Sequence, residues 1–298
     1  MQRLALAAIP LCLGVLLAGG YAAASASAED TAAQPAAPAA NEPAPRTQFA
    51  ILGERTQGGW VRGLAPTGAV SARLGTQELV LEPDGAFFAA FDRDAAGQEE
   101  FVATMADGST IATPVVIAPR NWNIEHVNVA RSAGGPSASF MERRRPELAQ
   151  INAARTQDAP ATGSEEDFIW PLTGRISGRF GSQRIYRGEP GSYHSGIDIA
   201  TGGSGNPFVA PASGVVTLAT DRPFSLEGNL LIIDHGHGLN SAFLHLSDIA
   251  VKEGDVVEQG QLLGHIGSSG RATGPHLHWS IKWRDARLDP LLFTGPMP

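Results

Sequence analysis

Residues 276–282 read His-Leu-His-Trp-Ser-Ile-Lys, a run that alternates polar with apolar side chains. This alternation is typical of a β-strand with one buried face. Because residues two apart in a strand point to the same face, the imidazoles of His276 and His278 would share one side, opposite Leu277. Such a pair is a natural metal or catalytic arrangement, and it also occurs among ordinary surface or core histidines.

The rest of the C-terminal half has a similar pattern of short apolar runs. Residues 215–216, 230–233 and 241–245 predict further strands, with glycines and prolines between them. No long amphipathic helix is expected here. The pattern predicts an antiparallel, partly open β architecture in which long loops carry the functional site.

Histidine is concentrated in this half, since seven of the eight histidines lie between His194 and His278. Neutral imidazole is the commonest metal ligand in proteins. Residues 194–198 (His-Ser-Gly-Ile-Asp) add one imidazole and one carboxylate. Together with one histidine of the 276–278 pair, they supply the three ligands of a catalytic zinc site with an open position. The other histidine would be free for acid–base chemistry.

These segments together resemble the lysostaphin/LytM-type zinc metallopeptidases, a family of peptidoglycan endopeptidases. Residues 193–200 (YHSGIDIA) resemble the first metal motif of that family, and residues 273–279 (TGPHLHW) resemble the second. The other matching blocks are 229–236 (NLLIIDHG), 243–247 (FLHLS), 251–257 (VKEGDVV), Gly260-Gln261 and Leu288-Asp289-Pro290. The resemblance covers residues 168–298 in the family's order, and agreement of several blocks makes a chance match improbable.

The resemblance implies roles for five residues. His194, Asp198 and His278 would hold one Zn²⁺ per catalytic domain. His245 and His276 would lie beside the open coordination position as catalytic residues. Zinc would activate a water, and an imidazole would take its proton and return it to the leaving amine. The division of these tasks between the two catalytic histidines stays open.

One position departs from the family pattern. Phe243 stands where many relatives have a tyrosine, which removes a hydroxyl contact but no ligand or base. Some members of the family have lost zinc ligands and act only as regulators of other wall enzymes. All five matched positions are kept here, which disfavours that alternative.

The remaining histidines are expected to be structural. His235 and His237 lie in a glycine-rich loop, and His126 and His265 have no matching role. Three acidic residues are expected to carry solvated surface carboxylates, with orientation of an imidazole as the alternative for each: Glu227, Asp234 and Asp248.

The N-terminus has the order of a secretory signal. Arg3 is followed by an apolar run over residues 4–18, and small residues lead to Ala26-Ser27-Ala28. The run is short for a membrane span, which needs about 20 residues. We therefore expect residues 1–28 to be a signal peptide cleaved after Ala28, and the alternative is a retained anchor.

The single cysteine, Cys12, lies inside this signal, so the mature chain would have no disulfides and no cysteine ligands. Ile9-Pro10 directly precedes Leu11-Cys12, which is not the pattern of a lipoprotein signal. Any metal would then be held by His, Asp or Glu.

Between the signal and the metallopeptidase segment, the sequence predicts a further module and two linkers. Residues 29–46 are rich in alanine and proline and predict an extended tether. Residues 47–119 contain short apolar runs split by turn signals such as Asp107-Gly108, and they predict a small β-sandwich-like module. Residues 120–167 predict a linker with a short helix over 140–155, with Pro146 near its first turns.

The predicted fold class is therefore mainly β, with a small N-terminal β module and a C-terminal antiparallel β metallopeptidase domain. The predicted function is zinc-dependent hydrolysis of peptidoglycan cross-links, with D-alanyl–diaminopimelate as the favoured bond and glycyl bridges as the other family option. The expected partners are peptidoglycan stem peptides, and a regulator or wall-enzyme partner stays open. The net charge of −8 disfavours nucleic acid, which needs a basic surface.

Three alternatives to this function stay open from the sequence. The first alternative is a non-catalytic regulator of a wall amidase. The second is a carbohydrate- or peptide-binding protein whose histidines are incidental. The third is a zinc peptidase that acts on proteins. The signal predicts that the mature protein lies in the periplasm or cell envelope, or outside the cell, with no stable membrane span after cleavage of the signal.

Overall fold

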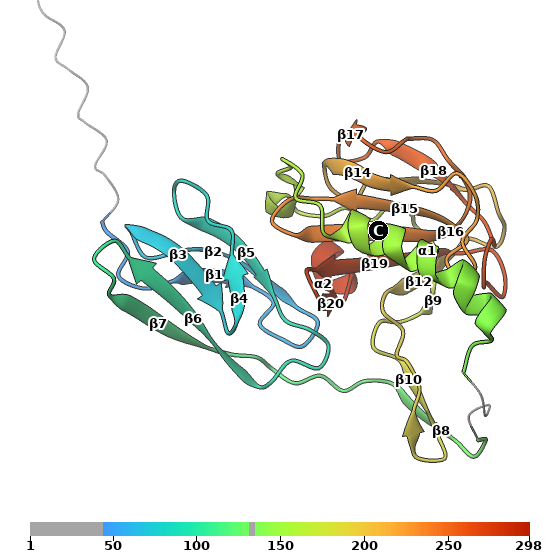
Figure 1. The fold of residues 1–298 in the computed structure, drawn as a ribbon, viewed down its shortest axis with the longest axis horizontal. Coiled ribbons are helices and arrows are strands. Elements are labelled where there is room, and N and C mark those ends of the chain that lie inside the picture. The colour runs from blue at the N-terminus through green and yellow to red at the C-terminus, as the bar shows by residue number, and fades with distance from the viewer. Residues whose placement is uncertain (1–43, 131–134) are drawn as a thin grey trace, which may run out of the picture. The chain divides into compact units, whose positions relative to one another are not determined.

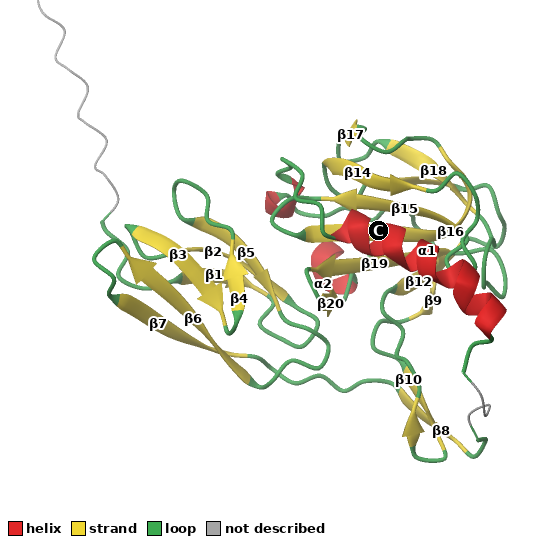
Figure 2. Cartoon of the chain, in the orientation of Figure 1, coloured by secondary structure: helices red, strands yellow, loops and turns green. Residues whose placement is uncertain are grey.

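A large antiparallel sheet forms the C-terminal half of the computed structural model, which describes residues 44–130 and 135–298. The predicted signal peptide and nearly all of the predicted tether lie outside these residues. Within them the sheet has ten strands: β9 (Arg175–Gly178), β12 (Ile197–Ala200), β13 (Pro207–Val209), β14 (Gly214–Ala219), β15 (Asn229–Asp234), β16 (Leu239–Ile249), β17 (Val256–Val257), β18 (Leu262–Ile266), β19 (Leu277–Trp283) and β20 (Ala286–Leu288). The prediction of a mainly β chain is confirmed (Figure 2).

The strand order places β19 inside the sheet, between β16 and β12. The main path runs β17-β14-β15-β16-β19-β12-β9, and each of its pairings is antiparallel. The strands expected at 215–216, 230–233, 241–245 and 276–282 are present as β14, β15, β16 and β19. His276 lies just before β19 and forms an isolated bridge with Gly267.

The two faces of β19 have different surroundings. Leu277, Trp279 and Ile281 are fully buried in the main core. Strand alternation therefore directs His278 to the opposite face. That second face is partly covered by a helix.

Helix α1 (Ala138–Arg155) lies over this second face of the sheet (Figure 1). The Ser137 side chain accepts a hydrogen bond from the Phe140 backbone N–H and caps its start. Ala154 and Ile151 of the helix pack with a small apolar cluster from the sheet and its loops, made of Leu218, Phe224, Leu230, Ile232, Ala242 and Leu244. The predicted helix at 140–155 is thus confirmed, although it begins two residues earlier and Pro146 lies in its third turn.

The N-terminal module has two small sheets around an aromatic core. One sheet has β1 (Ala50–Gly53), β2 (Trp60–Leu64) and β5 (Ala86–Ala90), and the other has β3 (Ala69–Leu74), β4 (Gln77–Leu79), β6 (Gln98–Met105) and β7 (Thr110–Val116). The rings of Phe49, Phe87 and Phe101 contact one another, with centroids 5.3–5.7 Å apart. Asp107-Gly108 forms the turn between β6 and β7 that the sequence predicted, with Gly108 at a φ of 82°.

The segment predicted as a linker does more than connect. β8 (Ile124–Val127) pairs in parallel with β10 (Gln183–Tyr186), and β10 pairs with β11 (Glu189–Pro190). The linker interpretation of residues 124–127 is therefore wrong, because their backbone groups are bonded to the C-terminal half. The short helices η1 (Gly163–Glu165) and α2 (Leu291–Thr294) complete the described elements.

The module and the C-terminal half share one apolar core. The Trp60 indole N–H donates to the Leu292 carbonyl oxygen at 2.9 Å, and the rings of Phe88, Trp283 and Phe293 lie side by side. The two halves are therefore packed against each other by buried aromatic area.

Among the described residues, no helix has the length and apolarity needed to cross a membrane.

Phe88→Ala is expected to lower the free energy of unfolding by about 3–5 kcal/mol, because Phe88 is 2% exposed and its ring contacts both halves. Urea denaturation followed by far-UV circular dichroism measures this change. Val116→Ala is the matched control, since Val116 is 71% exposed and should change stability by about 0.5 kcal/mol or less. Equal stability of the two variants would contradict the shared core.

Candidate metal and catalytic site

The register of two neighbouring strands brings Asp198 and His278 together. These residues are direct cross-strand partners on β12 and β19. On both sides of Asp198, the side chains of Ile197 and Ile199 are fully buried in the core. The pleat therefore turns the carboxylate and the imidazole toward the same outer face.

Three ligand atoms converge at this point. Asp198 Oδ1 lies 2.9 Å from His278 Nδ1 and 3.1 Å from His194 Nε2. The two imidazole nitrogens are 3.1 Å apart, and all three atoms lie within 4.8 Å of one another. Ligands about 2.0–2.1 Å from a tetrahedral zinc lie roughly 3.3 Å apart, so this donor set fits a zinc ion.

The backbone around His194 fixes the ring for such a role. Its Nδ1–H donates to the Arg179 carbonyl oxygen at 3.1 Å, which directs Nε2 toward Asp198. The backbone N–H of His194 donates to Ser182, and its carbonyl oxygen accepts from Gly181. Backbone hydrogen bonds within the loop 179–194 therefore hold His194 in place.

Two glycines make room for the cluster. A Cβ at Gly178 would lie 2.3 Å from Asp198 Oδ2, and a Cβ at Gly196 would lie 2.9 Å from His278 Nε2. Gly196 belongs to a motif found in the sequence. The need for Gly178 was missed, because a single glycine in a strand gives no signal of what approaches it.

His245 and His276 lie beside the cluster with their ring centroids 4.9 Å apart. His245 Nδ1–H donates to the Ser269 carbonyl oxygen at 2.9 Å, and His276 Nδ1–H donates to that of Gly274 at 2.8 Å. Each ring is therefore oriented through its Nδ1 by a backbone carbonyl oxygen, and His276 Nε2 lies 3.6 Å from Asp198 Oδ1.

His245 also has an unusual backbone conformation. Its φ is 65°, which is rare for a residue other than glycine, and its N–H donates to the Glu227 carbonyl oxygen. A strained backbone of this kind typically marks a side chain whose direction matters.

The charge state of the site follows from burial and hydrogen bonding. Burial opposes ionisation of Asp198, but hydrogen bonds from His194 and His278 outweigh it and hold the pKa of this carboxyl far below its usual range. Burial lowers the pKa of His278 and of His245. These imidazoles are therefore neutral at pH 7, as a metal ligand and a general base must be.

All five residues predicted as ligands or catalytic groups are brought together. Among the described residues, the three acidic residues considered for orienting an imidazole form no side-chain hydrogen bond with this cluster. The Glu227 carboxylate binds Arg144 of helix α1 at 2.6 Å, and Asp248 pairs with His265 at 2.9 Å. Asp234 is only 3% exposed and accepts the backbone N–H groups of Ala159 and Gly236, so the expectation of a solvated surface carboxylate is wrong for this residue.

The histidines expected to be structural lie apart from the cluster. His235 is fully buried, and its Nδ1–H donates to Ser213 while its Nε2 accepts from the Ser241 hydroxyl. His237 contacts Glu82 of the N-terminal module at 2.8 Å and Ser164 at 2.9 Å. These hydrogen bonds satisfy the buried imidazoles, so their burial is explained without a catalytic role.

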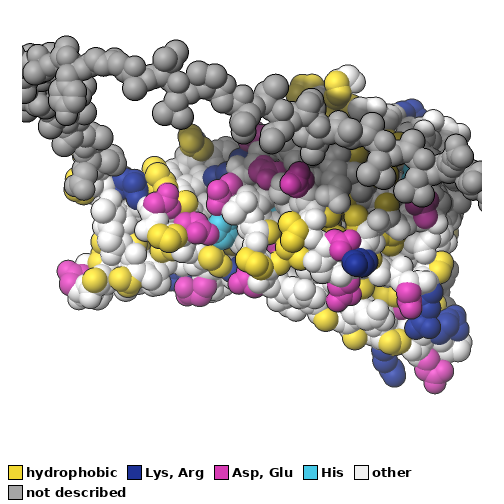
Figure 3. Space-filling view, turned by 90° about the horizontal axis from the view of Figure 1, so that it is seen from above, with side chains coloured by type: hydrophobic (Ala, Val, Ile, Leu, Met, Phe, Trp, Pro, Cys, Tyr) yellow, Lys and Arg dark blue, Asp and Glu magenta, His cyan; other side chains and the backbone are white. Residues whose placement is uncertain are grey.

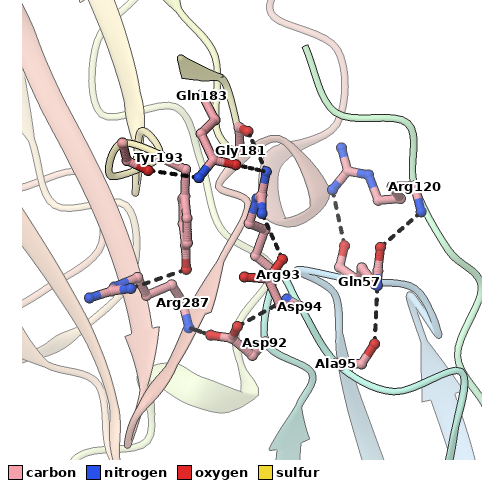
Figure 4. A network of polar contacts seen from close by, with 11 residues as sticks. Gln57, Asp92, Arg93, Asp94, Ala95, Arg120, Gly181, Gln183, Tyr193 and Arg287 are labelled. Carbon is pink, nitrogen blue, oxygen red and sulfur yellow. Dashed lines mark hydrogen bonds and ion pairs between the residues drawn. The ribbon is translucent and has the colours of Figure 1, made fainter. Parts of the chain in front are cut away.

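A polar network from the module supports the loop that carries His194 (Figure 4). Buried Arg93 donates to the Gly181 carbonyl oxygen at 3.0 Å and to Gln183 at 3.2 Å. Its guanidinium also lies 4.5 Å from the Tyr193 ring centre, and the Tyr193 hydroxyl accepts from Arg287 at 3.2 Å. This support was not predicted from the sequence, because Arg93 lies outside the segment that resembles the family.

Comparison with known proteins agrees with this geometry. Residues 192–290 match the model of "Peptidase family M23". This segment is a peptidase family M23 domain. It contains all five residues of the site.

Relatives of the M23 domain include named wall enzymes. The chain is 36% identical over 127 residues to the peptidoglycan DD-endopeptidase ShyA of Vibrio cholerae, covering 41% of this chain and 28% of that protein. It is 36% identical over 128 residues to the DD-carboxypeptidase/endopeptidase Mpg of Neisseria meningitidis, covering 42% and 28%. The match thus spans under a third of each relative's length.

One solved structure is similar over both halves. The crystal structure of a putative peptidase M23 from Pseudomonas aeruginosa has a TM-score of 0.61 at 28% identity and covers 81% of this chain and 95% of that one. Because the M23 segment alone is much shorter than this, the similarity extends beyond the M23 domain.

Arg93→Ala is expected to weaken zinc binding about tenfold, because support for a ligand-bearing loop typically has an effect of this size. Competition with a chelator of known zinc affinity measures the change. Arg73→Ala is the matched control, since Arg73 is an exposed arginine of the same module. Unchanged zinc affinity in Arg93→Ala, with only stability reduced, would limit Arg93 to holding the halves together.

His235 predicts a pH dependence of stability. Burial lowers its pKa from 6.5 to about 4, so the unfolded chain binds this proton more readily. The resulting stabilisation is complete above pH 6.5 and is lost as the pH falls toward 4, by about 3 kcal/mol. Urea denaturation of wild type and His235→Gln across this range should give a flatter curve for the variant, and parallel curves would refute the buried neutral ring.

Proposed function

We propose that this chain is a zinc-dependent metalloendopeptidase that hydrolyses peptide cross-links of peptidoglycan, at the D-alanyl–diaminopimelate bond. The observation that carries the proposal is the convergence of His194, Asp198 and His278, with His245 and His276 beside them, inside an M23 domain. Two imidazoles and a carboxylate leave one position of a tetrahedral ion open, which is the arrangement of catalytic zinc sites.

The three converging side chains would hold the ion. When bound, zinc would polarise the scissile carbonyl and make a water acidic enough to lose a proton near pH 7. Arg179 would keep the His194 ring turned toward the ion through its carbonyl oxygen. Asp198, ionised over the whole working range, would supply the negative charge of the ligand set.

The two remaining histidines would handle protons. Each has its Nδ1–H tied to a backbone carbonyl oxygen and its Nε2 free. Burial favours the neutral form of His245, which suits it to accept a proton from the attacking water and return it to the leaving amine. A protonated imidazole at either position would stabilise the developing oxyanion.

The substrate proposal comes from the relatives. Proteins named as peptidoglycan DD-endopeptidase and DD-carboxypeptidase/endopeptidase share 36% identity with this chain over its C-terminal part. We propose in the same way that residues 1–28 direct export, which would bring the enzyme to its substrate in the periplasm or cell envelope.

Purified sacculi should release soluble muropeptides when incubated with the zinc-loaded chain. His278→Ala and a chelated wild-type sample should release far less, because the variant lacks one ligand of the ion and the chelated sample lacks the ion itself. Mass spectrometry of the products identifies the bond. A loss of about 10³-fold or more in rate is expected for the variant.

The negative outcomes separate the alternatives. A chain that binds one zinc but releases no muropeptide would favour the amidase-regulator function, and stimulation of an amidase by the chain would then establish it. Cleavage of casein or another protein, without cleavage of sacculi, would favour a protein substrate. A chain that binds no zinc would overturn the site assignment.

A further inference from the structure

The backbone of His245 is held by contacts outside its own strand. The register between β15 and β16 shifts at this point, so that Leu244 and His245 together lie opposite the single residue Leu230. Such a β-bulge redirects a side chain, and the φ of 65° at His245 is a conformation that costs energy for a residue with a Cβ. The backbone N–H of His245 donates to the Glu227 carbonyl oxygen at 2.8 Å. The strained residue is therefore held by the segment that leads into β15.

The same segment contacts the residue that orients the imidazole. Ser269, whose carbonyl oxygen accepts the Nδ1–H of His245, also accepts the Asn229 backbone N–H on its hydroxyl oxygen at 2.9 Å. The chain approaches Ser269 so closely at Gly228 that a Cβ there would lie 2.2 Å from this hydroxyl oxygen. Residues 225–229 therefore support both the backbone and the ring of His245.

Helix α1 holds the segment 225–229 through two charged side chains. Arg144 Nη1 and Nη2 each donate to one oxygen of the Glu227 carboxylate at 2.6 Å. Glu147, about one turn further along the helix, accepts the backbone N–H and the hydroxyl of Ser225 at 2.8 and 2.7 Å. Arg144 also donates to Glu147 at 3.0 Å, which joins the two contacts into one network. A bidentate contact between arginine and a carboxylate fixes direction as well as distance.

The charged groups of this network are buried. On the face that Figure 3 shows, acidic and basic side chains lie in solvent among apolar ones. By contrast, the side chains of Arg144, Glu147 and Glu227 are only 9%, 13% and 16% exposed. Buried ion pairs add little net stability compared with apolar side chains of the same size. The geometry that this network imposes on the segment 225–229 therefore explains it better than stability does.

We propose that Arg144 is a positioning residue for the reaction, which acts through Glu227 to hold His245 beside the open position of the zinc site. The inference rests on the proposed function, in which His245 accepts and returns a proton. Its imidazole must keep one direction during both steps, since a misplacement of about 1 Å costs roughly 10²-fold in rate. Helix α1 lies outside the matching segment 192–290, so a residue from outside the M23 domain supports its catalytic group.

The candidate metal ligands do not depend on this network. His194 is held by its own loop, and Asp198 and His278 are fixed by the pairing of β12 with β19. The contacts of Arg144 therefore affect proton transfer and leave ion binding unchanged. Arg93 differs in this respect, because it contacts the loop that carries His194.

Steady-state cleavage of a purified cross-linked muropeptide dimer by the zinc-loaded chain tests the proposal. In Arg144→Gln, kcat should fall about 10²-fold with KM within about twofold, because substrate still binds while His245 is misdirected. Arg144→Lys keeps the charge without the bidentate contact and should recover part of the loss. The zinc affinity of Arg144→Gln, measured by competition with a chelator, should equal that of wild type.

Two variants of the same helix are the controls. Arg145→Gln removes the exposed neighbour of Arg144 and should leave kcat and stability unchanged. Ile151→Ala removes apolar contacts further along α1, so it should lower the free energy of unfolding with kcat within about twofold. Equal losses of kcat in Ile151→Ala and Arg144→Gln would reduce the effect to a loosened helix and overturn the positioning role. If Arg144→Gln folds poorly, Glu227→Gln gives the same test from the other side of the ion pair.

A spectroscopic measurement separates this inference from the proposed function. In the zinc-free chain with nitrogen-15 histidine, the Nδ1–H proton of His245 should give an NMR signal, because its hydrogen bond to Ser269 slows exchange with water. The signal, assigned with His245→Gln, should shift or be lost in Arg144→Gln and remain in Arg145→Gln. This result in a chain that cuts no sacculi would keep the control of His245 by Arg144 and overturn only the endopeptidase. An unchanged signal in Arg144→Gln, whatever its kcat, would overturn the positioning role.

Discussion

The pairing of β12 with β19 is the constraint on which the functional site depends. Asp198 and His278 face each other across these strands because their neighbours Ile197, Ile199 and Trp279 are committed to the core. A shift of one residue in register would bury the carboxylate and expose isoleucine. The hydrophobic core therefore sets the positions of Asp198 and His278, and the loop 179–194 adds His194.

This arrangement places an ionised carboxylate between two imidazoles in a half-buried position. Such a group is costly unless it is fully bonded, and here His194 and His278 supply the bonds. These hydrogen bonds keep the three side chains together, and a bound cation would take their place. The polar cluster is held by its own hydrogen bonds, by Gly178 and Gly196, and by the network from Arg93.

The sequence predicted the parts of this structure that have a local signal. Strand alternation gave β19 and the shared face of its histidines, and family motifs gave all five residues of the site. The roles of Arg93 and Gly178 were out of reach, because each depends on a partner distant in the chain. Asp234 and β8 were misjudged for a related reason: their burial and pairing come from backbone groups, which no side-chain pattern reveals.

Helix α1 has a consequence for how the chain can be divided. It precedes the segment that resembles the family, yet Ala154 and Ile151 cover apolar side chains of β14 and β15, and Arg144 neutralises Glu227 beside His245. A fragment starting at Phe168 would expose that apolar patch to water and leave a half-buried carboxylate without its cation. An exchangeable unit of this protein therefore begins no later than Ser137, the cap of α1, at least some thirty residues before the family segment.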